Sequence, residues 1–140
     1  MTETPRLDQI NLVVSDMAAS VAFYRRLGVV IQDTAPEWDP HHRSADLGSG
    51  IDLDLDSETF AKHWNQGWSG GRVVVGFKVD SRQQVDKIHD DLVSAGYRSQ
   101  QRPYDAFWGA RYAIIEDPDG NCVGIMSPVD PDQRSSTSPP

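Results

Sequence analysis

Apolar and polar residues alternate near the start of the chain. Residues 8–15 place Ile10, Leu12 and Val14 on one face, and the residues between them on the other. A period of two with one apolar face is typical of a strand that is covered on one side. Residues 17–27 follow with apolar positions at helical spacing, so we expect an amphipathic helix there.

The remaining elements follow from the same two periodicities and from turn residues such as the Asp-Pro-Asp-Gly-Asn run at 117–121. In the first half we expect strands over 29–34, 43–48 and 51–56, followed by a short helix near 57–65. In the second half we expect a strand over 72–79, a helix over 82–95, and strands over 97–102, 110–116 and 122–127.

The two halves repeat the same order of elements. Val14 and Val79 are matching points, so the offset is 79 − 14 = 65 residues, which is typical of two fused copies of one unit. We therefore predict an α+β fold of two βαβββ modules, in which each sheet covers the other around a cavity. The predicted boundaries are 6–58 for the first module, 59–71 for a linker, 72–128 for the second module and 129–140 for a disordered tail outside the site.

Charge and composition narrow the possible partners. The chain has 140 residues, enough for one domain with its own core, and a formal net charge of −8. An acidic chain lacks the basic face that nucleic acid requires, and no apolar run is long enough to span a membrane. Cys122 is the only cysteine, which excludes an intrachain disulfide. We expect a cytoplasmic protein that binds a small molecule.

Three motifs carry a family resemblance across residues 6–128. They are Leu7-Asp8-Gln9 with Val14-Ser15-Asp16, Phe23-Tyr24-Arg25-Arg26-Leu27-Gly28, and Asp117-Pro118-Asp119-Gly120-Asn121. In this order and repeated spacing they resemble the vicinal oxygen chelate superfamily, which includes glyoxalase I, bleomycin resistance proteins and extradiol dioxygenases. The resemblance implies curved mixed sheets that wrap a central cavity, and a homodimer.

The same resemblance implies four metal-ligand positions, one on the first and one on the last strand of each half. In the first half these positions carry Gln9 and, as the most natural match, Asp52. In the second half they carry Val74 and Gly124, which have no donor atom for a divalent ion. We therefore expect no metal and no cofactor.

An aromatic segment before the strand at 110–116 is the strongest candidate for ligand contact. Together with the Asp-Pro-Asp-Gly-Asn motif, the run Trp108-Gly109-Ala110-Arg111-Tyr112-Ala113-Ile114-Ile115 resembles the mitomycin-binding resistance proteins of the superfamily. In that branch a Trp at the position of Trp108 and a His, here His42 with His41 one residue away, sandwich a quinone. Large flat side chains suit a planar ligand.

Asp52, Asp54 and Asp56 share one face of a predicted strand, and we expect Asp52 alone to face the ligand. An acidic cleft would also suit a basic glycopeptide of the bleomycin type. The residues predicted to bind the ligand are Trp108, His42, Asp52, Tyr104, Phe107, Arg111, Trp38, Tyr112 and Gln9.

Three functions are compatible with these residues. The first is a metal-free protein that sequesters a planar aromatic or quinone-type molecule, as in drug resistance or self-protection. The second is a glyoxalase-like enzyme without metal, such as an isomerase, in which Asp52, His42, Tyr104 and Arg111 supply acid–base groups and an anion anchor. The third is a metal-dependent lyase or dioxygenase with an unusual ligand set. No serine, cysteine or histidine pattern indicates a nucleophile.

Overall fold

A computed structural model describes residues 4–136 and 138–139. The first half comprises β1 (Arg6–Val14), α1 (Met17–Leu27), β2 (His42–Asp46) and β3 (Asp52–Ser57). Helix α2 (Glu58–Trp64) leads to the second half, which comprises β4 (Val73–Lys78), α3 (Arg82–Ser94), β5 (Ser99–Asp105), β6 (Arg111–Glu116) and β7 (Cys122–Met126). A short 3₁₀ helix, Pro131–Gln133, follows. The α+β class is confirmed.

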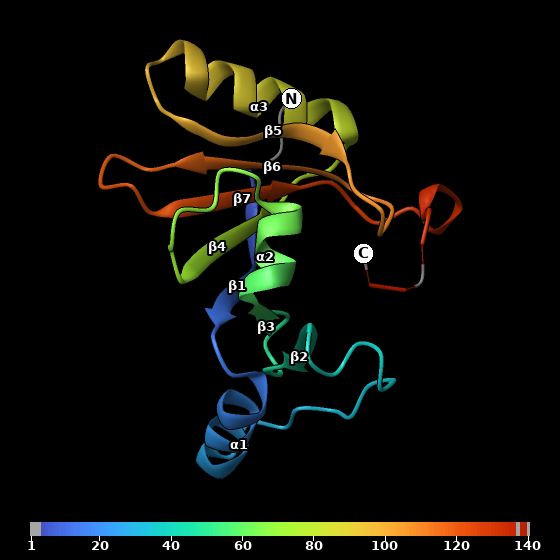
Figure 1. Ribbon diagram of the computed structural model, residues 1–140. Coiled ribbons are helices and arrows are strands. Elements are labelled where there is room, and N and C mark those ends of the chain that lie inside the picture. Colours follow the sequence, from blue (N-terminus) through green and yellow to red (C-terminus); the bar gives the residue numbers. More distant parts are fainter. Residues whose placement is uncertain (1–3, 137, 140) are drawn as a thin grey trace.

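The strands form one curved, mixed sheet in the order β2-β3-β1-β4-β7-β6-β5 (Figure 1). β1 and β4 pair antiparallel at its centre and join the two halves. Their ladder places Gln9 opposite Gly76 and Asn11 opposite Val74. Adding 65 to Gln9 and Asn11 gives positions 74 and 76, so the pairing maps onto itself under the sequence repeat. The two halves are therefore related by a pseudo-twofold axis that passes between β1 and β4.

The first half departs from the predicted βαβββ order, because residues 29–34 form no strand. The backbone carbonyls of this segment bond to arginine side chains in place of a neighbouring strand. Arg25 donates to Ile31 O at 2.5 Å, and Arg43 donates to Gln32 O at 2.7 Å. Apolar residues such as Ile31 still pack against α1, which explains why the segment looks like a strand in the sequence.

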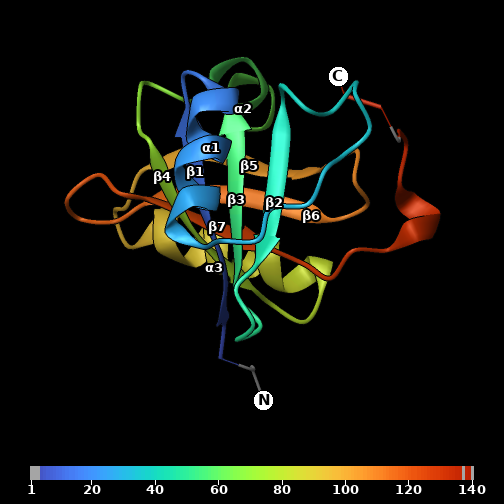
Figure 2. The ribbon, with the colours of Figure 1, turned by 90° about the horizontal axis from the view of Figure 1, so that it is seen from below.

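The helices divide between the two faces of the sheet. α1 packs on the outer face of the first half, against β3, and α3 packs on the outer face of the second half, against β5, β6 and β7 (Figures 1 and 2). α2, in the predicted linker, contributes Phe60, Ala61 and Trp64 to a separate core cluster with Val13 and Tyr112. None of the helices that the structure describes has the length and apolar character required to cross a membrane.

The apolar face of β1 is the one that α1 covers. Leu12 and Val14 pack in the α1 cluster, while Val13 belongs to the α2 cluster on the opposite face. The polar residues of β1, Gln9 and Asn11, share the face of Val13. This polar face points to the interior of the curved sheet, where the second half covers it.

The described part of the segment 129–140 differs from the predicted disordered tail. Asp130 donates its backbone N–H to Gly109 O at 2.9 Å, and Ser135 donates its own to Phe107 O at 2.9 Å. Such backbone bonds require no hydrophobic pattern, so the sequence gives no signal for them. They hold Arg134 against the loop at 107–109, at the rim of the cavity described below.

Candidate functional site

One cavity of about 330 Å³ occupies the interior of the curved sheet. Its walls come from β1, the loop before β2, β2, β3 and α2, and from the 107–109 loop, β6, β7 and the C-terminal segment. The volume falls at the lower end of the range for small-molecule sites. The lining residues are Gln9, Asn11, Trp38, His42, Asp54, Asp56, Phe60, Trp64, Phe107, Trp108, Tyr112, Met126 and Arg134.

Aromatic rings form most of the wall. Trp38 and Phe107 lie nearly parallel, with ring centroids 6.2 Å apart and an interplanar angle of 21°. Trp108 stands edge-on to Phe107 at 5.3 Å and to Tyr112 at 5.6 Å. Its indole N–H points to Met126 Sδ at 3.4 Å, which fixes the ring. Rigid rings of this kind offer flat apolar surface at a small cost in conformational entropy.

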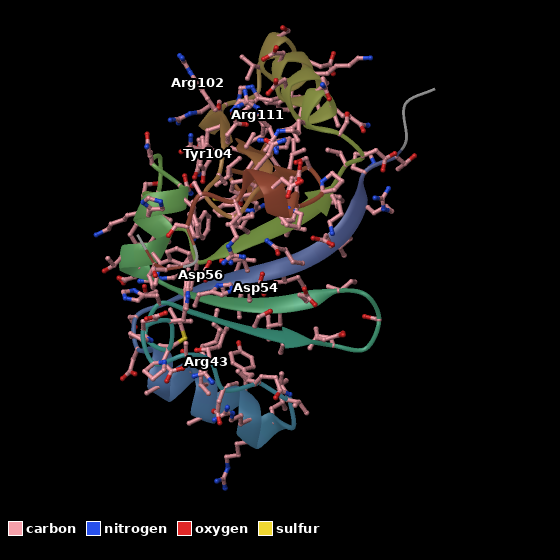
Figure 3. All side chains as sticks on the ribbon, turned by 90° about the vertical axis from the view of Figure 1, so that its right-hand side faces the viewer. Arg43, Asp54, Asp56, Arg102, Tyr104 and Arg111 are labelled. Carbon is pink, nitrogen blue, oxygen red and sulfur yellow. The ribbon has the colours of Figure 1, made fainter. Side chains whose placement is uncertain are left out.

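Polar side chains of β1, β2 and β3 form one wall of the cavity, which we call its floor. Asn11 Nδ2 donates to Asp56 Oδ2 at 2.8 Å, and the other oxygen of Asp56 bonds His42 Nδ1. Asp54 Oδ1 accepts from Ser44 Oγ at 2.7 Å. Figure 3 shows Asp54 and Asp56 on the side of β3 that faces the second half, with Arg43 on the opposite side.

Burial and mutual charge set the protonation of these groups. Burial raises the pKa of Asp54 to about 6, against a smaller opposing effect of Ser44 and His42. For His42, burial lowers the pKa, but the hydrogen bond and charge of Asp56, with the charge of Asp54, raise it overall above its usual 6.5. Burial raises the pKa of Tyr112 well above 10, so its phenol stays neutral. At neutral pH the floor therefore holds a buried carboxylate, Asp54, beside a hydrogen-bonded His42–Asp56 pair.

The residues at the four implied metal positions do not fit a metal. β3 lies beside β1 as β7 lies beside β4, with Asn11 next to Asp54 and Gly76 next to Gly124. The 65-residue repeat therefore matches Gly124 with Asp54, which corrects the assignment of Asp52. A Cβ placed on Gly124 would lie 2.9 Å from Tyr112 Oη, so a tyrosine ring fills the space of a ligating side chain.

Val74, the other second-half position, also lacks a donor. Across the described residues, no group of three or more His, Cys, Asp or Glu side chains is arranged to hold a metal ion.

The structure gathers most of the residues predicted to bind the ligand. Those that line the cavity are Trp108, His42, Phe107, Trp38, Tyr112 and Gln9. His42 rather than His41 faces the cavity, where its ring lies 5.9 Å from Phe60 and 6.3 Å from Trp38. The choice that the sequence left open is settled by β2, which begins at His42.

Three predicted residues lie outside the cavity. Asp52 is exposed at the far end of β3, where Asp46, Asp8 and Lys78 are its charged neighbours. Tyr104 packs behind Trp108 and donates its hydroxyl to Trp64 O at 3.2 Å. Arg111 forms ion pairs with Asp86 at 2.9 Å and Asp105 at 3.1 Å. These contacts give Tyr104 and Arg111 structural roles.

Other cavity residues were missed in the sequence. Asp54 and Asp56 carried a signal, because they share a face with Asp52, but the sequence did not show which end of that face is enclosed. Asn11 lies on the same face as Gln9 and could have been found in the same way. Phe60, Trp64 and Met126 were not predicted to bind the ligand, and nothing in the sequence pointed to Arg134.

Residues 6–125 match the model of the Glyoxalase/Bleomycin resistance protein/Dioxygenase superfamily. The uncharacterized protein YraH of Bacillus subtilis (strain 168) is 35% identical over 129 residues, which cover 86% of this chain and 96% of that protein.

Two solved structures share the fold. Methylmalonyl-CoA epimerase of Streptomyces coelicolor has a TM-score of 0.60 at 22% identity, with 91% of this chain and all of that chain covered. An extradiol ring-cleaving dioxygenase of B. fuscum has a TM-score of 0.63 at 21% identity, with 92% of this chain and 34% of that chain covered.

Proposed function

The chain belongs to the glyoxalase/bleomycin resistance protein/dioxygenase superfamily, and we propose that it is a metal-free binding protein that sequesters a planar aromatic or quinone-type small molecule. The cavity carries this proposal. Trp38, Phe107 and Trp108 supply flat apolar walls around a cavity of ligand size. Drug resistance or self-protection of the mitomycin or bleomycin type is the biological role that such binding would serve.

Retention of a planar ligand requires no acid, base or metal. Stacking and edge contacts of aromatic pairs contribute about 0.5–1.5 kcal/mol each beyond burial of their surface. Such contacts, added to the apolar area that a planar molecule would bury, supply binding free energy without any chemical step. The poor fit of Val74 and Gly124 to a metal agrees with this role, since the superfamily's metal chemistry needs the donors that they lack.

Tryptophan fluorescence tests the proposal directly. Protein dialysed against a chelator is titrated with mitomycin C, a bleomycin and a panel of planar quinones. We expect saturable quenching that is lost in Trp108→Ala. Trp68→Ala is the matched control, because Trp68 lies outside the cavity, with its indole N–H bonded to Gly71 O at 2.7 Å.

The bound molecule is then recovered, and its mass is measured by mass spectrometry. Unchanged ligand in stoichiometric amount supports sequestration. Conversion of the ligand, or failure of every planar compound to quench, contradicts it.

His42 and Asp56 favour a second candidate, a glyoxalase-like enzyme. Asp56 orients the imidazole through Nδ1, which leaves Nε2 as the nitrogen that meets a ligand, and Asn11 holds the other carboxylate oxygen. This arrangement is typical of a positioned general acid or base. Turnover of a trial substrate that is lost in His42→Gln, with a pH profile that follows the histidine, would favour this candidate over simple binding.

A further inference from the structure

Asn11 carries a buried hydrogen-bond acceptor without a partner at the cavity floor. Its side chain is buried, with the residue only 5% exposed, and its Nδ2 donates to Asp56 Oδ2. An ionised carboxylate only accepts, so the amide nitrogen must face Asp56 and the oxygen must face elsewhere. Asn11 Oδ1 has no hydrogen-bond partner among the residues that the structure describes. A buried acceptor without a donor costs about 1–3 kcal/mol, which a suitable ligand would recover.

Asp54 presents a second acceptor beside it. Asn11 and Asp54 are register partners in the parallel β1–β3 pair, and the two side chains share the cavity face. Ser44 binds Asp54 Oδ1, whereas Oδ2 accepts no hydrogen bond from any residue that the structure describes. The two oxygens without donors therefore belong to adjacent residues of one wall.

Three nearby protein donors are already engaged. His42 Nδ1 and Asn11 Nδ2 both bind Asp56, and Ser44 Oγ binds Asp54. His42 and Gln9, which line the cavity, carry further donors, and the indole N–H of Trp64 has no partner among the described residues, but none of these groups donates to Asn11 Oδ1 or Asp54 Oδ2 in the part of the chain that the structure describes. A ligand with two N–H groups can therefore satisfy both oxygens.

The charged residues of the cavity also favour a ligand with N–H donors. Four lining residues can carry a charge, namely His42, Asp54, Asp56 and Arg134. His42 neutralises Asp56 when it is protonated, and the exposed Arg134 lies on the C-terminal segment, where its Nε donates to Ser136 O at 2.9 Å. Asp56 pairs with His42, whereas Asp54 forms no ion pair with any described residue.

We propose that the ligand is a planar aromatic amine or amidine that inserts its N–H-bearing end first and donates to Asp54 and Asn11. This inference rests on the proposed function, and it names the chemical class of the sequestered molecule. The aromatic walls take the ring system, and the floor selects for a cationic or strongly polarised N–H group. Charge-assisted hydrogen bonds in an enclosed site provide this selectivity.

Three probes with one ring system separate stacking from N–H donation. At pH 7.5, 9-aminoacridine is a cation with N–H donors, acridine is neutral without them, and N-methylacridinium is a cation without them. Binding is measured by equilibrium dialysis. We expect 9-aminoacridine to bind at least about tenfold more tightly than either of the others, because only it supplies donors to both oxygens.

Asp54→Asn is expected to reduce this preference to about twofold or less, because the variant lacks the carboxylate charge. Asp52→Asn is the matched control, since Asp52 lies on the same strand face outside the cavity, and it should leave the preference intact. The comparison of the three probes on the wild-type protein does not depend on whether either variant folds.

Equal binding of the three probes, still dependent on Trp108, would overturn the amine inference and leave the proposed function standing. An undiminished preference in Asp54→Asn would also overturn it. Failure of all three probes to bind would contradict the proposed function itself.

Discussion

Replacement of Asp54 by asparagine should stabilise the protein. The carboxyl is buried, and burial raises its pKa to about 6 from an ordinary 3.8. A carboxyl with a higher pKa in the folded state binds its proton more tightly there, so its contribution to stability falls as the pH rises through the window between 3.8 and 6. At 1.36 kcal/mol per pKa unit, ionised Asp54 costs about 3 kcal/mol at pH 8 and about half of that at pH 5.

Asparagine removes this charge and keeps the shape. Its amide oxygen can still accept from Ser44 Oγ, and its nitrogen becomes a donor beside the open Oδ1 of Asn11. We therefore expect the free energy of unfolding of Asp54→Asn to exceed that of the wild type by up to about 3 kcal/mol at pH 8, and by less at pH 5. A residue that costs stability and lies on the floor of a cavity is typical of a functional site.

Urea unfolding at pH 5 and pH 8 measures the difference. His42 titrates in both proteins, so subtraction of the two curves mainly reports Asp54. Asp52→Asn serves as the control for removal of one negative charge at the surface, where its effect should be small. A variant less stable than the wild type at pH 8, or a gain of the same size at both pH values, would refute the reasoning.

Three other predictions concern the loop at 107–109, the tyrosine in the cavity and metal binding. Gly109 has a φ of +97°, and a Cβ there would collide with Asp130 O, so Gly109→Ala should lose about 1–3 kcal/mol in urea unfolding and speed tryptic cleavage after Arg134. The control Gly28→Ala, with φ +111° and open space, should lose less and cleave normally. Gly124→Ala should cost about 1–3 kcal/mol and weaken ligand binding, since its Cβ displaces Tyr112; unchanged affinity would contradict this. Added Zn²⁺, Ni²⁺ or Mn²⁺ should shift the melting temperature by no more than about 1 °C, whereas a saturable rise would indicate a metal site.

The sequence pattern predicted an element correctly where local residues alone decide its structure. The helix predicted over 17–27 is α1, Met17–Leu27, because Asp16 caps its start and Gly28, in the left-handed conformation, ends it. The strand predicted over 29–34 was wrong because its structure depends on more than the local pattern. Its apolar residues pack like those of a strand, but a strand also needs a backbone partner, and arginine side chains take that place.

The residues of the candidate site also separate into those that local patterns predicted and those that they did not. Trp108 and His42 were predicted because aromatic side chains beside glycine and a family resemblance are visible in the chain itself. Asp54 was passed over in favour of Asp52, since the three aspartates of β3 look alike in sequence. Their difference is one of position along the cavity wall, which depends on where the second half covers the first.

The sequence by itself determined the periodicity, the 65-residue repeat and the residues that share each face of β1 and β3. Those properties are local, because side-chain direction follows from backbone geometry alone. Only the tertiary structure decided that the polar face is an interior wall and not a solvated surface. That outcome requires two segments distant in sequence to pair through β1 and β4 and curve around one space, so that α1 covers the apolar face and the second half encloses Asn11, Asp54 and Asp56.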